Sequence, residues 1–279
     1  MVKIEYPNTP AVPLVCDSPH SGTFYPDDFK YAVDFADLRR CEDTHVEKLW
    51  AAVPAVGGTL VHATFPRSYT DTNRTEFDIE VDMIEGTWPG RAEPSPRCLK
   101  LGNGLVFSKT TTLQSIYNRK LSIAEVQHRI ESCWRPYRLA LAQELNKASH
   151  AHGKRWHLNL HSMPSNAYER LGLSKDKVLA DVVLGNLRGA ACSEAFTEFM
   201  AQAFRARGYT VAINDPYVGM DLLVAHGDPS KQHESLQIEL NRALYLNEQT
   251  REPLPQFDKV QADLSSLLAE LASHIQQQL

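Results

Sequence analysis

Short apolar runs alternate with longer amphipathic stretches along most of the chain. Five runs have the length and residue types of strands and stop at polar residues or proline: 14–16, 59–65, 156–160, 209–213 and 236–240. Longer segments repeat apolar residues every three or four positions, which predicts helices over 123–145, 192–207 and 264–275. Strands that alternate with helices predict an α/β protein with a mixed, mainly parallel sheet covered by helices on both faces.

The helix predicted from Ile123 has clear boundary signals. Ser122 and Glu125 have the spacing of a capping box at its start, and Gly153 follows its end. Pro136 lies inside the apolar pattern, where proline removes a backbone donor and clashes with the preceding turn. We therefore expect a kink or two consecutive helices in this segment.

No internal repeat, low-complexity tract or linker divides the chain, so residues 1–279 are predicted to form a single domain. The segment 86–96 (GTWPGRAEPSP) is the most irregular part of the sequence. Irregular segments of this length inside a domain are typical of surface loops and active-site lids. We expect a surface excursion or an active-site flap there, not a domain boundary.

Composition places the chain among ordinary globular proteins, with 43% hydrophobic and 23% charged residues. A formal net charge of -5 gives no electrostatic basis for binding nucleic acid or an anionic membrane. No run approaches the roughly 18 apolar residues of a membrane span, and the N-terminus lacks the apolar core of a signal peptide. The five cysteines show no CxxC spacing, so we expect mostly buried, reduced thiols and a cytoplasmic location.

Polar residues collect where the predicted strands end. Residues 17–22 (DSPHSG) follow the first apolar run, 67–74 (RSYTDTNR) follow the second, and 161–162 (HS) follow the third. In open α/β sheets, ligands bind beyond the carboxyl ends of the strands. These three segments therefore predict a site at one edge of the sheet, although each alone is also typical of an ordinary polar loop.

Two of these strand ends carry a histidine, His20 and His161. A carboxylate-rich helix start at 42–47 (EDTHVE) adds acidic side chains, which also suit the helix dipole without any ligand role. Two histidines and one carboxylate are the ligand set that leaves a zinc position open for water. Zinc bound in this way activates the water and polarises an amide carbonyl.

Two further features suit such chemistry. Glu239 alternates with Ile238 and Leu240, so it points to the opposite face of its strand. A carboxylate in that setting is typical of a proton carrier or of a paired structural group. The donors of segment 67–74 suit capture of a substrate carboxylate, because the planar arginine fork binds carboxylates in a bidentate way. A surface Arg–Asp pair is the alternative interpretation of that segment.

Taken together, the motifs resemble the N-formylglutamate amidohydrolase family. The resemblance extends over roughly residues 12–245 and consists of six motifs in order: SPHSG at 18–22, DTHV at 43–46, Arg67 with DTNR at 71–74, WRPY at 134–137, LHS at 160–162 and QIEL at 237–240. It implies a fold similar to zinc carboxypeptidases and phosphorylase/hydrolase-like proteins. It also implies Zn2+-dependent hydrolysis of a small-molecule N-acyl amino acid, N-formyl-L-glutamate, to formate and L-glutamate in histidine degradation.

The resemblance also assigns roles to residues of the metal site and the reaction. It matches His20 and His161 to the metal histidines and Asp43 to the acidic ligand, with Glu42 and Glu47 as alternatives. It matches Glu239 to the carboxylate that acts as general base and then as general acid.

For the substrate, the resemblance matches Asn73 and Arg74 to a pair that orients a carboxylate. Arg74 alternatively polarises the carbonyl oxygen. Arg67 and Arg188 are further candidates for the second carboxylate of a glutamate-like substrate.

The sequence departs from the family pattern in two places. Glu42 stands in a CED segment where members commonly read DTD, and Asn159 stands where they commonly carry aspartate. These departures leave open a carboxypeptidase-like or N-acylamino-acid deacylase with another substrate, or a non-catalytic binding protein. A serine hydrolase built on Ser162 is disfavoured, because the G-x-S-x-G surround of such a nucleophile is missing. The sequence predicts no oligomeric state.

Overall fold

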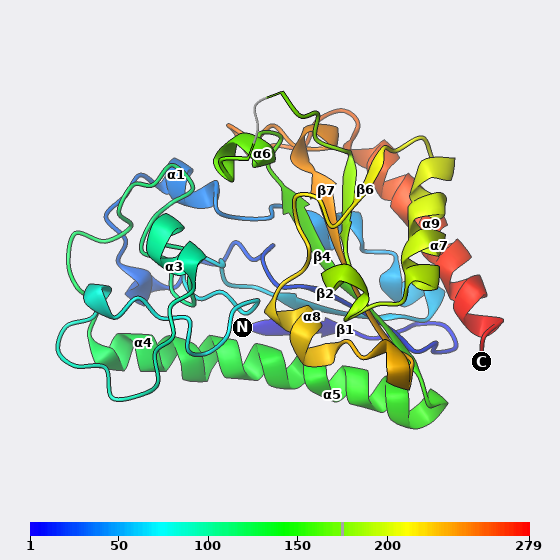
Figure 1. Cartoon of the computed structure of the whole chain (residues 1–279), viewed down its shortest axis with the longest axis horizontal. Coiled ribbons are helices and arrows are strands. Elements are labelled where there is room, and N and C mark those ends of the chain that lie inside the picture. Colours follow the sequence, from blue (N-terminus) through cyan, green and yellow to red (C-terminus); the bar gives the residue numbers. More distant parts are fainter. Residues whose placement is uncertain (174–175) are drawn as a thin grey trace. The chain divides into compact units, whose positions relative to one another are not determined.

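The computed structural model describes residues 1–173 and 176–279, which contain a seven-stranded sheet (Figure 1). The strands lie in the order β1-β3-β2-β4-β7-β5-β6. Their bounds are β1 (Val2–Glu5), β2 (Leu14–Ser18), β3 (Thr59–Ala63), β4 (Arg155–Met163), β5 (Val182–Gly185), β6 (Val211–Ile213) and β7 (His233–Asn241). Each of the five predicted runs overlaps a strand, whereas the four-residue strands β1 and β5 were not expected.

The sheet is mixed and mainly parallel, as the sequence predicted. Strand β4 pairs in parallel with β2 on one side and with β7 on the other. Strand β5 pairs antiparallel with β7 and parallel with β6. The carboxyl ends of β2, β4 and β7 therefore meet at one edge, whereas the carboxyl end of β5 lies at the opposite edge.

Strand β4 is buried on both faces, and its two faces differ in chemistry. Leu158 and Leu160 project into the apolar core, so the alternating residues His157, Asn159 and His161 project from the other face. All three polar residues are at most 2% exposed. One face of the sheet therefore carries the core, and the other carries a buried row of polar side chains.

Nine α-helices lie within the described ranges. Their bounds are α1 (Phe35–Arg39), α2 (Val46–Leu49), α3 (Pro96–Leu101), α4 (Ile123–Arg129), α5 (Arg135–His152), α6 (Ala167–Arg170), α7 (Glu194–Ala206), α8 (Asp221–His226) and α9 (Phe257–Gln276).

The predicted capping box of α4 is present, since Ser122 Oγ accepts from the Glu125 amide and the Glu125 carboxylate accepts from the Ser122 amide. A π-helical turn at Ile130–Trp134 separates α4 from α5. The expected pair of consecutive helices around Pro136 is thus confirmed.

The apolar core lies between the sheet and helices α2, α7 and α9. Figure 1 shows α7 and α9 on the same side of the sheet. The buried residues are Leu49 and Trp50 at α2, Phe196 and Met200 on α7, and Leu264, Leu267, Leu268, Leu271 and Ile275 on α9. The face of α9 is the apolar face that the sequence predicted. On the polar face, helix α8 lies beside β4, with the His226 ring edge-on to His157 at 5.9 Å between ring centroids. Helices therefore cover both faces, as expected.

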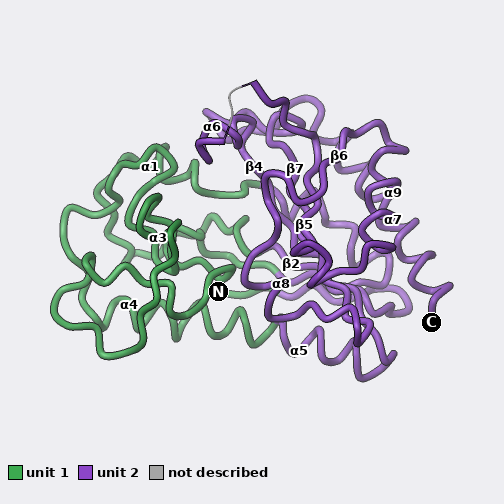
Figure 2. The backbone as a smooth tube through the Cα atoms, in the orientation of Figure 1, with its two compact units in different colours: residues 1–3, 19–44, 62–140 green, residues 4–18, 45–61, 141–279 purple. Residues whose placement is uncertain are grey.

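The chain forms two compact units, each assembled from separate segments (Figure 2). Unit 1 comprises residues 1–3, 19–44 and 62–140, and unit 2 comprises residues 4–18, 45–61 and 141–279. Unit 2 contains most of the sheet and the apolar core. Unit 1 has its own apolar cluster, which includes Ile79, Ile84 and Leu105, and a buried Arg129 that donates to Tyr69 O and Tyr117 Oη. The single domain expected from the sequence stays a prediction.

The five cysteines are buried and form no disulfide, as expected. Burial raises the pKa of Cys16 and Cys192 well above the ordinary thiol value, so both stay protonated. Among the described residues, no helix is both long enough and apolar enough to cross a membrane.

Candidate active site

His161 and Glu239 are neighbours on adjacent strands of unit 2. Strands β4 and β7 run parallel with the His161 Cα opposite the Glu239 Cα, so both side chains project from the same face. They lie near the carboxyl ends of their strands and are 2% and 8% exposed. Gln237 Nε2 donates to Glu239 Oε1 at 3.0 Å and so holds the carboxylate in place. Ile238 and Leu240 lie in the core on the other face, as predicted.

The His161 ring is held by a buried chain of polar side chains in unit 2. His161 Nε2 lies 2.7 Å from Asn159 Oδ1, and Asn159 Nδ2 donates to Asp17 Oδ1 at 2.7 Å. Asp17 Oδ1 also lies 2.8 Å from His157 Nε2. Sequence reasoning assigned no role to Asp17 or His157, because the pairing of Asp17 with Asn159 depends on the register between β2 and β4.

His20 lies in unit 1, in a loop whose shape requires a glycine. A Cβ atom on Gly22 would lie 2.2 Å from the Phe65 carbonyl oxygen, so no other residue fits there. The loop is also held by the His20 carbonyl, which accepts from the Asp43 amide at 3.0 Å. His20 Nε2 lies 2.6 Å from Asp71 Oδ1, and His20 Nδ1 lies 3.4 Å from Asp43 Oδ2.

The structure distinguishes among the three acidic candidates of segment 42–47. The Glu42 carboxylate accepts from Tyr25 Oη at 2.6 Å and from Thr44 Oγ1 at 2.9 Å, and it pairs with Arg39. Burial and the Glu42 charge together raise the pKa of Tyr25. Glu47 belongs to unit 2, in the first turn of α2. Asp43, which is 1% exposed, is therefore the candidate whose carboxylate lies against His20.

Asp71 is the centre of the polar loop in unit 1, and sequence reasoning saw it only as a possible partner of Arg67. Its Oδ2 accepts from Arg67 Nη2 at 2.8 Å and from Arg67 Nε at 3.2 Å, and its Oδ1 accepts from the Asn73 amide at 2.9 Å. Burial alone would raise the pKa of Asp71, but Arg67, His20 and Arg74 outweigh burial and hold that pKa well below its usual range. The carboxylate is therefore charged at neutral pH.

The two arginines of this loop differ in exposure. Arg67 is 18% exposed, and its Nη1 lies 3.7 Å from Asp43 Oδ1. Arg74 is 3% exposed, and it donates from Nε to Asn103 O and from Nη1 to Asn73 O. Burial lowers the pKa of Arg74 to about 10 against the opposing effect of Asp71, so Arg74 remains a cation at neutral pH.

The structure does not bring Arg188 to the sheet edge that carries His161 and Glu239. It follows the carboxyl end of β5, and because β5 is antiparallel to β7, this end lies at the sheet edge opposite the carboxyl ends of β4 and β7. Its side chain is exposed, and its backbone is left-handed with φ 56°. The role of Arg188 as a candidate for the second substrate carboxylate stays a prediction.

A buried arginine that the sequence hypothesis missed lies just beyond β7. Arg242 is 4% exposed, donates from Nε to Ser162 Oγ at 3.1 Å, and donates from Nη2 to Ser162 O at 3.3 Å. A serine hydroxyl that accepts from a guanidinium is held in place by a cation. A nucleophilic serine instead needs a base that takes its proton. Among the described residues, the contacts of Ser162 are those of a hydroxyl held by Arg242, and they include no base on its Oγ.

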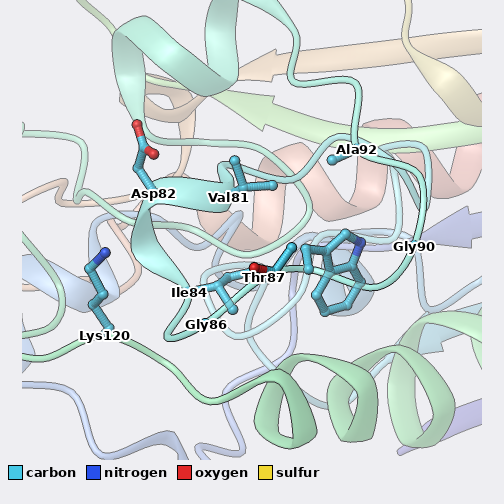
Figure 3. Close-up of a pocket in the computed structure, with 9 residues that line it drawn as sticks. Val81, Asp82, Ile84, Gly86, Thr87, Gly90, Ala92 and Lys120 are labelled. Carbon is cyan, nitrogen blue, oxygen red and sulfur yellow. The ribbon is translucent and has the colours of Figure 1, made fainter.

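An open pocket of about 320 Å³ lies in unit 1 (Figure 3). Part of its wall comes from the irregular segment, with Gly86, Thr87, Trp88, Gly90 and Ala92. The other lining residues are Val81, Asp82, Ile84 and Lys120, and Asp82 and Lys120 lie on the same side of the pocket (Figure 3). None of the candidate site residues lines this pocket. The segment is the surface excursion that the sequence predicted, and its possible role as a flap stays a prediction.

The buried polar side chains of the candidate site form two sets, one in each unit. Unit 1 presents an imidazole, His20, with the Asp43 carboxylate beside it and the cations Arg67 and Arg74 nearby. Unit 2 presents a second imidazole beside the Glu239 carboxylate. In both histidines Nε2 is engaged by a side-chain oxygen, which fixes the ring as in histidines that ligate metals.

Comparison with known proteins gives consistent matches. The sequence model of the N-formylglutamate amidohydrolase family matches residues 12–246. The N-formylglutamate deformylase of Pseudomonas putida is 26% identical over 242 residues, covering 85% of this chain and 83% of that protein. The crystal structure of N-formylglutamate amidohydrolase from Ralstonia eutropha JMP134 is 47% identical, covers 100% of this chain and 99% of that one, and superposes with a TM-score of 0.97. A gene product of Agrobacterium tumefaciens, 16% identical over 99% of this chain and 94% of its own, shares the fold with a TM-score of 0.68.

Proposed function

Because the chain belongs to the N-formylglutamate amidohydrolase family, we propose that it is a zinc-dependent enzyme that hydrolyses N-formyl-L-glutamate to formate and L-glutamate. The observation that carries this proposal is the pairing of His161 with Glu239 at the carboxyl ends of β4 and β7. A metal-ligand side chain and a proton-carrying side chain thus project side by side from one buried face. Ligand sites of open α/β sheets lie at this edge.

In this proposal His20, Asp43 and His161 hold the zinc ion. These three residues suit zinc, because each offers one ligand atom and together they supply two imidazole nitrogens and one carboxylate oxygen. All three side chains are buried. Nδ1 would be the ligand nitrogen of both histidines, since Nε2 is engaged by Asp71 in one and by Asn159 in the other. Zinc bound there lowers the pKa of a water molecule toward neutrality and polarises the formyl carbonyl.

Glu239 moves the protons. It accepts a proton from the water that attacks the formyl carbon, and it returns a proton to the amide nitrogen as the C–N bond breaks and L-glutamate leaves. The hydrogen bond from Gln237 keeps one carboxylate oxygen turned to a fixed donor.

The loop at 67–74 binds the substrate carboxylates. Arg74, a cation with a pKa of about 10, and the neighbouring Asn73 orient one carboxylate, and Arg67 binds the second. The partial exposure of Arg67 supports this division, because its guanidinium remains accessible while Asp71 holds it in place. Specificity for a dicarboxylic N-acyl amino acid follows from two fixed cations.

The decisive experiment replaces the proton carrier and leaves the metal ligands intact. Glu239→Gln keeps the shape of the side chain, and we expect kcat with N-formyl-L-glutamate to fall about 10²- to 10⁴-fold while zinc content is unchanged. Glu270→Gln on the exposed side of α9 is the matched control and should keep full activity. Formate release and metal content of the same samples are the readouts. Full activity of Glu239→Gln, or of wild-type protein after exhaustive chelation, would contradict the proposal.

A substrate panel separates this activity from its alternatives. N-formyl-, N-acetyl- and N-succinyl-L-glutamate and a short peptide should be compared at equal zinc loading. Turnover of the peptide or of another acyl group in preference to the formyl compound would redirect the assignment to a different amidohydrolase. Binding without turnover of any compound would indicate a binding protein.

A further inference from the structure

The polar face of β4 contains a buried hydrogen-bonded chain that ends on the His161 ring. From His161 it passes to Asn159, then to Asp17 on β2, then to His157, and ends at Ser235 on β7, whose Oγ lies 2.7 Å from His157 Nδ1. All five side chains are at most 2% exposed. All five belong to unit 2 and lie on the three neighbouring strands β2, β4 and β7 (Figure 1).

We propose that Asp17 is a positioning residue that sets the tautomer of His161 through the side-chain amide of Asn159. The inference rests on the proposed function in one respect, namely that His161 ligates the metal through Nδ1. Neither Asp17 nor Asn159 touches the metal or the substrate in this scheme. Their role is to determine which nitrogen of His161 carries the proton.

The donors and acceptors of Asp17, Asn159 and His161 determine the tautomer of His161. An ionised carboxylate only accepts, so the end of the Asn159 amide that lies 2.7 Å from Asp17 is its NH₂ group. The carbonyl end of the amide therefore faces His161 and also only accepts. His161 Nε2 must then carry a hydrogen and donate it to Asn159 Oδ1. A neutral His161 consequently has its lone pair on Nδ1, which is the form that binds a metal there.

Asp17 is itself held in place from its other side. The same oxygen, Oδ1, accepts from His157 Nε2 at 2.8 Å, which leaves His157 Nδ1 to accept from the Ser235 hydroxyl. The two donors on one carboxylate oxygen fix the direction in which Asp17 faces Asn159. Because the site is buried, a reversed Asn159 amide would place an oxygen against the carboxylate without a donor between them, which is costly.

The two proposed metal histidines are thus supported differently. His20 Nε2 contacts a carboxylate directly, since Asp71 Oδ1 lies 2.6 Å away. His161 Nε2 contacts a neutral amide, and the carboxylate of Asp17 lies one hydrogen bond further on, at the other end of that amide. An amide is a weaker acceptor than a carboxylate, so the orientation of His161 depends on the Asp17 carboxylate that holds this amide in place.

Three isosteric variants test the order of donors and acceptors in this hydrogen-bonded chain. Asp17→Asn keeps the shape and an acceptor oxygen but removes the charge that fixes the Asn159 amide, and we expect Zn2+ affinity to fall about 10- to 100-fold. Asn159→Asp places two carboxylates against each other in a buried site, and both Zn2+ affinity and thermal stability should fall.

The double variant Asp17→Asn/Asn159→Asp should recover Zn2+ affinity relative to both single variants. The residue 17 amide then gives its two N–H groups to the new carboxylate at 159 and to His157 Nε2. The proton of His157 moves to Nδ1, where the Ser235 hydroxyl oxygen accepts it. His161 keeps its proton on Nε2 and donates it to the carboxylate at 159. Recovery in a double variant is the non-additivity expected of groups that act as one network.

The measurements use the purified full chain. Zn2+ affinity is determined by competition with a chromogenic chelator, and the His161 tautomer is read from ¹⁵N shifts of the metal-free protein. Asp263→Asn on α9 is the matched control. It removes a carboxylate of unit 2 whose hydrogen-bond partners among the described residues are Tyr209 and Lys259, neither of them a member of the hydrogen-bonded chain, and it should change neither readout. Thermal unfolding of each metal-free variant establishes that it is folded.

The proposal is overturned if Asp17→Asn binds Zn2+ as tightly as wild type and keeps the proton on His161 Nε2, or if the double variant binds no better than the singles. These outcomes differ from a failure of the proposed function. In that case the wild-type protein binds no Zn2+ or hydrolyses no N-acyl amino acid, and the tautomer measurement still decides the role of Asp17.

Discussion

The replacement Asp71→Asn should destabilise the protein more than any other isosteric change in the loop at 67–74. Asp71 is completely buried, and its carboxylate accepts two hydrogen bonds from Arg67, one from the Asn73 amide and one from His20. Asparagine keeps one oxygen but turns an NH₂ group toward a donor. The two cations Arg67 and Arg74 also lose their shared counter-charge.

These contacts determine how much unfolding free energy the Asp71→Asn variant loses. A hydrogen bond to a charged group contributes about 1.5–3 kcal/mol, and removal of one partner of a buried pair costs about 3–5 kcal/mol. Arg67 is 18% exposed and recovers part of its hydration, so we expect the lower end, about 3 kcal/mol of unfolding free energy. Zn2+ affinity should fall as well, about 10- to 100-fold, because Asp71 orients the proposed ligand His20.

The assay is urea unfolding of the metal-free protein, followed by chelator competition for Zn2+ on the same samples. Asp82→Asn is the control, since Asp82 is exposed and belongs to the same unit, and a surface change of this kind stays within about 0.5 kcal/mol. The low pKa of Asp71 in the folded protein determines how its contribution to stability changes with pH. Its stabilisation is present above the pKa of the unfolded chain and is lost as pH falls through the folded pKa. A metal-free Asp71→Asn protein as stable as the control would refute this reasoning.

Two further predictions concern stability away from the site. The carboxyl of Glu125 accepts from Arg119 and from the Ser122 amide, which lowers its pKa from 4.5 to about 2; its stabilisation is therefore present above pH 4.5 and lost toward pH 2. In urea unfolding, the stability difference between wild type and Glu125→Gln should shrink across that window, and a difference that is constant with pH would argue against it. Leu268→Ala in the core should cost about 2–5 kcal/mol, against less than about 0.5 kcal/mol for the exposed Leu139→Ala, and equal thermal shifts in the two variants would contradict the described core.

The sequence pattern predicted the elements that have a single apolar face and missed those that do not. Helix α9 repeats its buried leucines at helical spacing, and the capping box of α4 is a local signal that needs no partner. Strand β5 is only four residues long, and its pairing depends on β7, which is remote in sequence. The place of Arg188 in the sheet could not be predicted for this reason, because the direction of a strand decides at which edge its last residues lie.

The candidate site shows the same division. His161 was expected just after a strand and lies inside β4, whereas Glu239 was expected on a strand and lies inside β7. Asp17 and Asp71 could not be assigned, because each contacts a partner far away in sequence, Asn159 in one case and His20 in the other. Residue type and spacing indicate which groups can do chemistry. The register between strands decides which groups support them.

Strand β4 shows why the register is so constrained in this protein. Its residues alternate between the apolar core, which Leu158 and Leu160 enter, and the polar face, where Asn159 pairs with Asp17 and His161 lies opposite Glu239. A shift of one residue would bring the polar side chains into the core and the leucines to the polar face. Neither face would then be satisfied, because the core would contain unpaired polar groups and the polar chain would lose its acceptors. The burial that stabilises the sheet therefore also aligns the side chains proposed to carry out the chemistry.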